Sequence, residues 1–144
     1  MRTTAAALIL FLFVPLSSSE ADEEIALQRL MNIVSVLQDL GDEMLGEPVT
    51  GTVTLGDTIA HKMNFSDEYM YHVHIWSDSY FNLMEFWLTD SGGEIHNIAG
   101  GDNASLAAYP DTSGEWTLQI LLHEGASSDS AYYAAAVFRA WRYI

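Results

Sequence analysis

The chain of 144 residues contains no cysteine and only 5 lysines and arginines, against 20 aspartates and glutamates. Without cysteine it forms no disulfide, carries no lipid-modified cysteine and uses no thiol nucleophile. The formal net charge of −15 repels the phosphates of nucleic acids and anionic membranes, so both are set aside as partners. The same charge favours cations or a basic partner, or else it serves solubility alone.

The sequence also lacks an apolar run long enough to span a bilayer comfortably. One basic residue, Arg2, precedes the apolar run Ala5–Leu16, and small residues follow up to Ala21. This order is typical of a secretory signal peptide, so we predict a signal peptide over 1–21 and a periplasmic or secreted bacterial protein. An uncleaved N-terminal anchor is the alternative. Removal of 1–21 takes away Arg2 and Glu20, so the net charge stays at −15.

Sequence motifs of common enzymes are missing. The chain has no G-x-S-x-G, H-E-x-x-H, P-loop or G-x-G-x-x-G pattern, and no D-x-[DN]-x-[DN]-G calcium loop. Acidic residues are too numerous for their spacing to single out a catalytic pair. A helix and a compact β-domain would also leave few loops long enough to form an active site. We therefore predict a protein that is not an enzyme.

The segment 22–46 has the apolar periodicity of an amphipathic helix. Asp22 can cap its N-terminus, Gly46 offers a C-terminal stop and Pro48 prevents continuation. The apolar stripe is wide enough to need a cover, either the chain's own domain or a partner helix. It consists of Leu27, Leu30, Met31, Val34, Leu37, Leu40, Met44 and Leu45.

Short runs of β-branched and aromatic residues, separated by glycine and Asx clusters, follow over 49–144 and predict a mainly β sandwich of about eight antiparallel strands. One run, "YYAAAVF", alternates poorly, which indicates burial on both faces, with the small alanines making room for the N-terminal helix. The expected strands are Val49–Leu55, Ile59–Phe65, Tyr69–Ser77, Phe81–Thr89, Glu94–Ile98, Ser105–Tyr109, Glu115–His123 and Ala131–Trp141.

Two histidines are candidate metal ligands. His72 and His74 lie two residues apart on an expected strand, so both imidazoles project from one face. A metal site needs a third or fourth ligand, which His61, His96 or His123 could supply. The alternative is a pair of half-exposed strand histidines.

Two acidic residues in glycine-rich turns are candidate ligands for calcium. Asp90 lies in "TDSGGEI" and Asp102 in "GGDNAS", and the two carboxylates could meet at a loop end and hold Ca²⁺. Both segments are also ordinary hairpin sequences. We expect no cofactor, with Ca²⁺ as the alternative.

The aromatic residues are the remaining candidates for ligand binding. Trp76 and Trp87 fall out of phase with the expected core positions, so one of them is a candidate exposed platform for a ligand. Trp116 and Trp141 are expected in the core. We interpret "YPDTSGEWTLQILL", Tyr109–Leu122, as a turn followed by a strand, with no chemistry of its own.

Two stretches within Gly51–Phe138 share one family pattern, "YHVHIWSDSYFNLMEFWLTDSGGEI" and "GGDNASLAAYPDTSGEWTLQILLHEGASSDSAYYAAAV". Together they resemble the bacterial pre-peptidase C-terminal (PPC) domain family. Asn82 and Asn103 stand where the family usually has aspartate. The matching positions are Tyr71, Val73, Ile75, Ser77, Phe81, Phe86, Leu88, Asp90, Gly93, Asp102, Asn103, Ser113, Gly114, Trp116, Leu118, Ile120 and Tyr133.

The resemblance implies a jelly-roll-type β-sandwich in an exported accessory protein. From it and the residues together, we predict a non-enzymatic binding protein that recognises a protein or a glycan. The first alternative is a divalent-metal-binding module or small metal-dependent enzyme that uses His72, His74 and nearby acids. The second is a structural protein that self-assembles into a homo-oligomer through the helix over 22–46.

Overall fold

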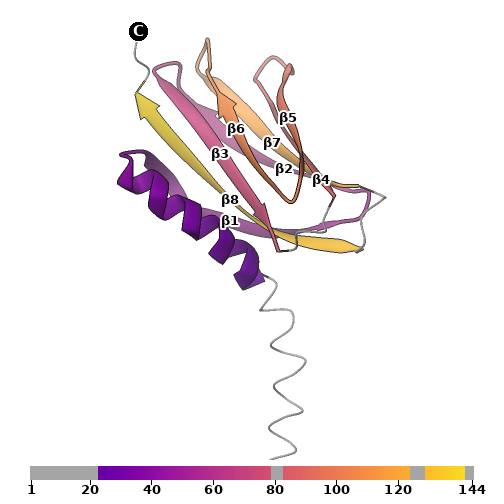
Figure 1. Cartoon of the computed structure of the whole chain (residues 1–144). Helices are drawn as coiled ribbons and strands as arrows, with labels where there is room; N and C mark the ends of the chain where they lie inside the picture. Colours follow the sequence, from indigo (N-terminus) through magenta and orange to yellow (C-terminus); the bar gives the residue numbers. More distant parts are fainter. Residues whose placement is uncertain (1–22, 79–82, 124–128, 142–144) are drawn as a thin grey trace, which may run out of the picture.

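The computed structural model describes residues 23–78, 83–123 and 129–141 (Figure 1). The predicted signal peptide over 1–21 and the predicted start of a strand at Phe81 lie outside these ranges. A helix over residues 23–39 precedes eight strands, and each of the eight predicted strands is confirmed. They are β1 (Glu43–Thr54), β2 (Thr58–Phe65), β3 (Tyr69–Ser77), β4 (Met84–Thr89), β5 (Ile95–Gly101), β6 (Asn103–Ala108), β7 (Gly114–Leu122) and β8 (Ser130–Trp141).

The strands form two four-stranded sheets. The first sheet has the order β1-β8-β3-β6 and the second has the order β2-β7-β4-β5. Every pairing between these strands is antiparallel. The chain passes repeatedly from one sheet to the other, with β1 beside β8 and β2 beside β7, which is the strand order of a jelly roll. The predicted jelly-roll-type β-sandwich is thus confirmed.

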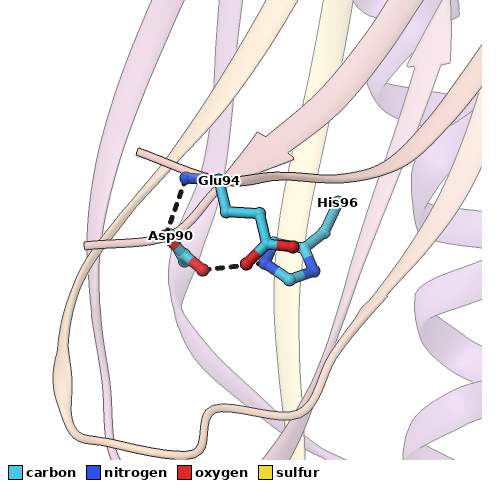
Figure 2. Close-up of side chains that lie close together, drawn as sticks. All are labelled: Asp90, Glu94 and His96. Atoms are coloured by element: carbon cyan, nitrogen blue, oxygen red, sulfur yellow. Dashed lines mark hydrogen bonds and ion pairs between the residues drawn. The ribbon is translucent and has the colours of Figure 1, made fainter. Parts of the chain in front are cut away.

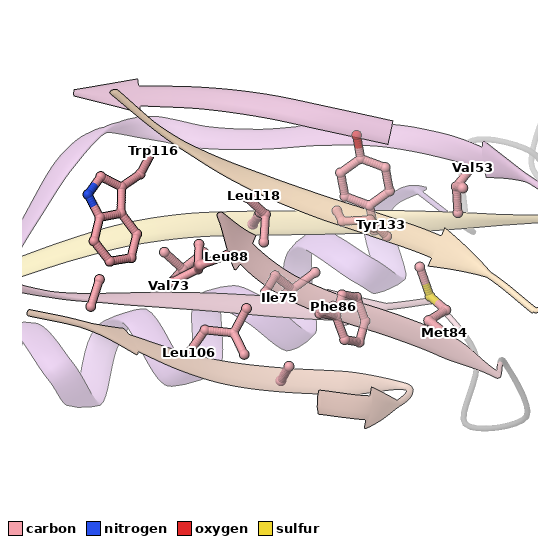
Figure 3. Close-up of a cluster of buried hydrophobic side chains, with 14 of the residues drawn as sticks. Val53, Val73, Ile75, Met84, Phe86, Leu88, Leu106, Trp116, Leu118 and Tyr133 are labelled. Atoms are coloured by element: carbon pink, nitrogen blue, oxygen red, sulfur yellow. The ribbon is translucent and has the colours of Figure 1, made fainter. Parts of the chain in front are cut away.

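The main core fills the space between the two sheets (Figure 3). Alternate residues point inward, as the period of two in a strand requires. Tyr71, Val73 and Ile75 of β3 and Trp116, Leu118 and Ile120 of β7 are all buried, as expected from the sequence. Burial of these apolar side chains stabilises the sandwich.

A second, smaller core lies between the helix and the outer face of the first sheet (Figure 1). Successive residues of β8 point alternately into the main core and toward the helix, so both faces of this strand are covered. The small side chains of Ala134 and Ala136 allow the helix to approach the sheet closely. The predicted burial of "YYAAAVF" beneath the helix is confirmed. The buried members of this second core are Ala26, Leu30, Val34, Ala134, Ala136 and Phe138.

The predicted C-terminal end of the helix is wrong. The helix ends at residue 39, and Gly41 takes the left-handed conformation with φ of 94°. The N–H of Gly41 donates to the carbonyl of Gln38, and the N–H of Asp42 donates to the carbonyl of Leu37. This is the Schellman arrangement, which satisfies the last carbonyls of the helix.

Residues 43–46, predicted to be helical, therefore belong to the start of β1, and the sandwich begins at Glu43 instead of Val49. Met44 pairs with Phe138 in the ladder between β1 and β8. Gly46, with φ of 67°, falls in a register shift between Leu45 and Val49. In the part of the chain that the structure describes, no helix is long and apolar enough to cross a membrane.

Candidate functional site

The hairpin between β4 and β5 holds the side chain of Asp90 in one position. Asp90 follows the last residue of β4, and its carbonyl accepts a hydrogen bond from the N–H of Gly93 at 3.0 Å. Its Oδ1 accepts two more, from the N–H of Gly92 and the N–H of Glu94, each at 2.9 Å. Gly93 has φ of 86°, a conformation that glycine adopts at no steric cost. The sequence Asp-Ser-Gly-Gly-Glu thus folds locally into a turn that fixes the carboxylate.

His96 completes a pair with this carboxylate. Its Nε2–H donates to Oδ2 of Asp90 at 2.8 Å, and the side chains of His96 and Asp90 are 35% and 22% exposed. The imidazole lies beside the indole of Trp116, with ring centroids 5.0 Å apart and an interplanar angle of 30°. Trp116 is buried in the core, so it restricts the orientation of the imidazole.

Hydrogen bonds stabilise the ionised form of this carboxyl group. The bond from His96, followed by the bonds from the N–H groups of Glu94 and Gly92, holds the pKa of Asp90 below its ordinary value. Asp90 is therefore a carboxylate at neutral pH, with one oxygen bound to the backbone and the other facing His96.

Glu94 brings a second carboxylate to the same place (Figure 2). Glu94 immediately precedes β5 and lies two residues before His96, and Figure 2 shows both side chains beside Asp90. One ligand atom each from Asp90, Glu94 and His96 lies within 4.8 Å of the other two. Across residues 23–78, 83–123 and 129–141, such a group of three forms at this place alone.

The three side chains border a pocket of about 350 Å³ at one end of the sandwich. One wall comes from the β4–β5 hairpin, and the other comes from the β6–β7 loop and the start of β7. Carboxylates and aromatic faces both attract cations, so the pocket is suited to a positively charged group. Its lining residues are Asp90, Ser91, Gly92, Glu94, His96, Tyr109, Asp111, Thr112 and Trp116.

The stretch Tyr109–Leu122 therefore contributes to the pocket as well as to the sheet. Its strand is confirmed as β7. The turn ahead of the strand, interpreted above as having no chemistry, supplies Tyr109, Asp111 and Thr112 to the pocket. The strand order brings this turn to the same end of the sandwich as the β4–β5 hairpin, because Thr89 pairs with Thr117.

The predicted metal ligands His72 and His74 lie elsewhere. Both are half-buried on the outer face of β3, with ring centroids 6.3 Å apart. The three histidines proposed as further ligands lie on or next to strands of the second sheet: His61 on β2, His96 on β5 and His123 just after β7. The two sets of histidines therefore do not converge.

The predicted pairing of Asp90 with Asp102 is wrong. Asp90 precedes β5 and Asp102 follows it, so they lie at opposite ends of one strand. A strand of this length separates them by roughly 20 Å. The carbonyl of Asp102 accepts a hydrogen bond from the N–H of Ser77 at 2.8 Å. Its Oδ2 is buried and has no hydrogen-bond partner among the described residues.

The candidate ligand-binding tryptophans are only half-exposed. Trp76 packs against the second core beneath the helix, and Trp87 lies on the outer face of β4 beside Gln119. The core position of Trp116 is confirmed, at 4% exposure. The prediction that Trp141 lies in the core is wrong. This residue ends β8 beyond the last buried side chain, is 62% exposed and lies against Tyr69 with ring centroids 4.5 Å apart.

The fold and the site together define a jelly-roll β-sandwich with an acidic, aromatic pocket at one end. No protein-family model matches the sequence, and no curated protein sequence is detectably similar to it. Similar proteins emerge from comparison of the three-dimensional structure with solved structures.

One similar structure is PliG from Aeromonas hydrophila, a periplasmic inhibitor of g-type lysozyme. It has a TM-score of 0.56 and 17% sequence identity over 70% of this chain and 90% of that chain. A second is the pre-peptidase C-terminal domain of a collagenase from Bacillus anthracis, with a TM-score of 0.48 and 16% identity over 65% and 89% of the two chains. A third is the mitogen from Yersinia pseudotuberculosis, with a TM-score of 0.45 and 16% identity over 67% and 85%. A PPC domain is thus among the structural neighbours.

Proposed function

We propose that this protein is an exported, non-catalytic β-sandwich that binds a basic protein through the acidic pocket. One observation carries the proposal. A pocket lined by three carboxylates, those of Asp90, Glu94 and Asp111, and by the rings of Tyr109 and Trp116 lies on a chain with a net charge of −15. Both the pocket and the whole molecule attract positive charge.

The pocket fits the chemistry of an arginine side chain. A guanidinium group pairs with a carboxylate through two parallel hydrogen bonds and also stacks on aromatic rings. Glu94 and Asp111 are exposed at the pocket, where a partner's side chain can reach them. Tyr109 is 53% exposed and offers a ring face beside them. Charge complementarity of this kind also speeds association and selects between partners.

Four further observations support a protein partner, export and a binding role. The structurally similar PliG is a periplasmic inhibitor of a lysozyme, which is itself a protein. The sequence over 1–21 has the pattern of a signal peptide. The chain lacks the catalytic motifs named above, and the helix covers its own sheet, which favours a binding role over self-assembly through that helix.

The test measures binding of the purified protein to two probes, a g-type lysozyme and an arginine-rich peptide, by calorimetry. We expect the double variant Glu94→Gln/Asp111→Asn to bind at least about tenfold more weakly, equivalent to about 1.4 kcal/mol. The control Asp57→Asn/Asp129→Asn removes the same charge at the other end of the sandwich, where Thr58 pairs with Leu121 and Thr54 with Ser130. Equal weakening by both double variants, or no binding of either probe, would contradict the proposal.

A further inference from the structure

We propose that Asp90, Glu94 and His96 form a binding site for one divalent transition-metal ion, with Zn²⁺ as the expected ion. This proposal goes beyond the binding of a basic protein and does not depend on it. It is carried by the convergence of three ligand atoms of suitable type, within 4.8 Å of one another, at the edge of an open pocket (Figure 2).

The spacing of the three ligand atoms is close to what zinc requires. With bonds of about 2.1 Å, neighbouring ligands in a tetrahedral site lie about 3.4 Å apart. Oδ2 of Asp90 and Nε2 of His96 are 2.8 Å apart, so an ion between them moves them apart by only a fraction of an ångström. The flexible side chain of Glu94 closes the remaining distance. The metal binds Nε2 of the neutral imidazole of His96, so the ring carries its proton on Nδ1 when the ion is bound.

Two of the three ligands are already held in place. Oδ1 of Asp90 accepts its two backbone hydrogen bonds, which leaves Oδ2 to face the metal. The ring of His96 is restrained by Trp116. Only Glu94, which is exposed, must become ordered when the ion binds. Fixed ligands of this kind reduce the entropy lost on binding.

The donor set selects the ion. An imidazole with two carboxylates suits zinc and similar transition metals, whereas Ca²⁺ takes six to eight oxygen ligands. The two carboxylates balance the charge of a divalent ion, so the ion and a partner's guanidinium would compete for them. Three protein ligands leave a fourth position, which faces the pocket and is open to water or to a donor from a partner. The site thus shares Asp90 with the calcium site considered for Asp90 and Asp102 but differs from it in the ion and in the other ligands.

The chain contains a natural control for this site. His123 Nε2 lies 2.9 Å from Oε2 of Glu85, so this pair resembles the contact between His96 and Asp90 in its distance and in joining a histidine to a carboxylate. Within the described part of the chain, no third ligand joins this pair. If a histidine beside a carboxylate were sufficient, both places would bind metal. We expect binding only where Glu94 completes the group.

The experiment titrates the tag-free, metal-stripped full chain with Zn²⁺ by calorimetry and with Co²⁺ by visible absorption. We expect one ion per chain, with Co²⁺ bands typical of a four-coordinate site. Glu94→Gln alters an exposed side chain and is expected to preserve the fold, which circular dichroism verifies. Glu94→Gln should weaken the binding of the metal ion at least about tenfold. His96→Asn should do the same, and His123→Asn should leave both affinity and stoichiometry unchanged.

Three results would overturn the proposal. The first is the absence of a stoichiometric ion. The second is undiminished binding by Glu94→Gln. The third is loss of binding in His72→Asn/His74→Asn with binding retained in His96→Asn, which would move the site to β3. Because the probe is the metal alone, failure to bind a basic protein does not affect the result.

Discussion

The phenolic oxygen of Tyr133 lies 2.6 Å from Nε2 of His61, and this hydrogen bond joins the two sheets of the sandwich. Tyr133 comes from β8 of the first sheet and is 1% exposed, whereas His61 comes from β2 of the second. Burial raises the pKa of Tyr133 and lowers the pKa of His61, so both groups are neutral at physiological pH. We assign the tautomer in which the phenol donates and Nε2 accepts.

Tyr133→Phe should destabilise the protein by about 1–2 kcal/mol, because it removes the donor and leaves a half-buried nitrogen without a partner. Urea unfolding followed by tryptophan fluorescence measures the change. A double-mutant cycle with His61→Ala isolates the pair, with an expected coupling of about 1 kcal/mol. Additive effects of the two substitutions would show that this contact contributes nothing.

Gly51→Ala should destabilise the protein by about 1–3 kcal/mol through overpacking. Gly51 pairs with Tyr133, and a Cβ at Gly51 would lie 2.5 Å from the phenolic oxygen and 2.8 Å from Cζ. The ring is enclosed by the core and has little room to move. Gly100→Ala is the matched control, since its Cβ would lie 3.6 Å from the carbonyl oxygen of Met84, an ordinary contact. Equal unfolding midpoints for the two variants would refute this account of Gly51.

Leu30→Ala should destabilise the protein by about 2–5 kcal/mol, because Leu30 is fully buried between the helix and the first sheet. Leu40→Ala, just beyond the same helix, serves as the control, since Leu40 is 74% exposed. Chemical unfolding compares the two variants. A similar effect of both would mean that the helix does not depend on this contact with the sheet.

His74→Phe should make the protein less sensitive to acid. Burial, followed by repulsion from His72, lowers the pKa of His74, although Asp42 partly opposes this. Because the unfolded chain then binds this proton more readily than the folded chain, stability falls as the pH drops below about 6.5 toward the lowered pKa. Phenylalanine removes the titration and also the buried Nε2, which has no hydrogen-bond partner among the described residues.

Unfolding midpoints between about pH 7 and pH 5 test this prediction over the range in which an ordinary histidine titrates. The slope of stability against pH should be smaller in His74→Phe than in the parent protein. His123→Gln is the control, because His123 lies at the surface beside Glu85, with its side chain 53% exposed. An unchanged slope in His74→Phe would show that other groups cause the acid sensitivity.

Much of the fold could be predicted because its signals are local. Glycine and Asx clusters separate the strands, and the alternation of Trp116, Leu118 and Ile120 identifies the buried face of β7. The end of the helix was mispredicted because Gly41 and Gly46 are both plausible stops. Pairing of Glu43 and Met44 with β8 decides in favour of Gly41, and that pairing is not visible in the local sequence.

Part of the candidate site, like part of the fold, could be predicted from the local sequence. Asp90 is a predicted cation ligand, and the structure brings it together with Glu94 and His96, which follow within six residues on the other side of a three-residue turn. All three residues lie within the short stretch "DSGGEIH", so their proximity could have been predicted from the sequence. The predicted partner Asp102 failed because it lies at the far end of β5. The contribution of Asp111 depends on which loops share an end of the sandwich.

By itself, the sequence determined where most of the strands lie, which faces of β3 and β7 are buried, and that both faces of β8 are covered. These properties follow from the period of the side chains and from the turn residues between the runs. Only the tertiary structure decided where the helix gives way to β1 and which loops meet around the pocket. Strand order is set by packing among residues far apart in the chain, and it alone places Tyr109 and Asp111 beside Asp90, Glu94 and His96.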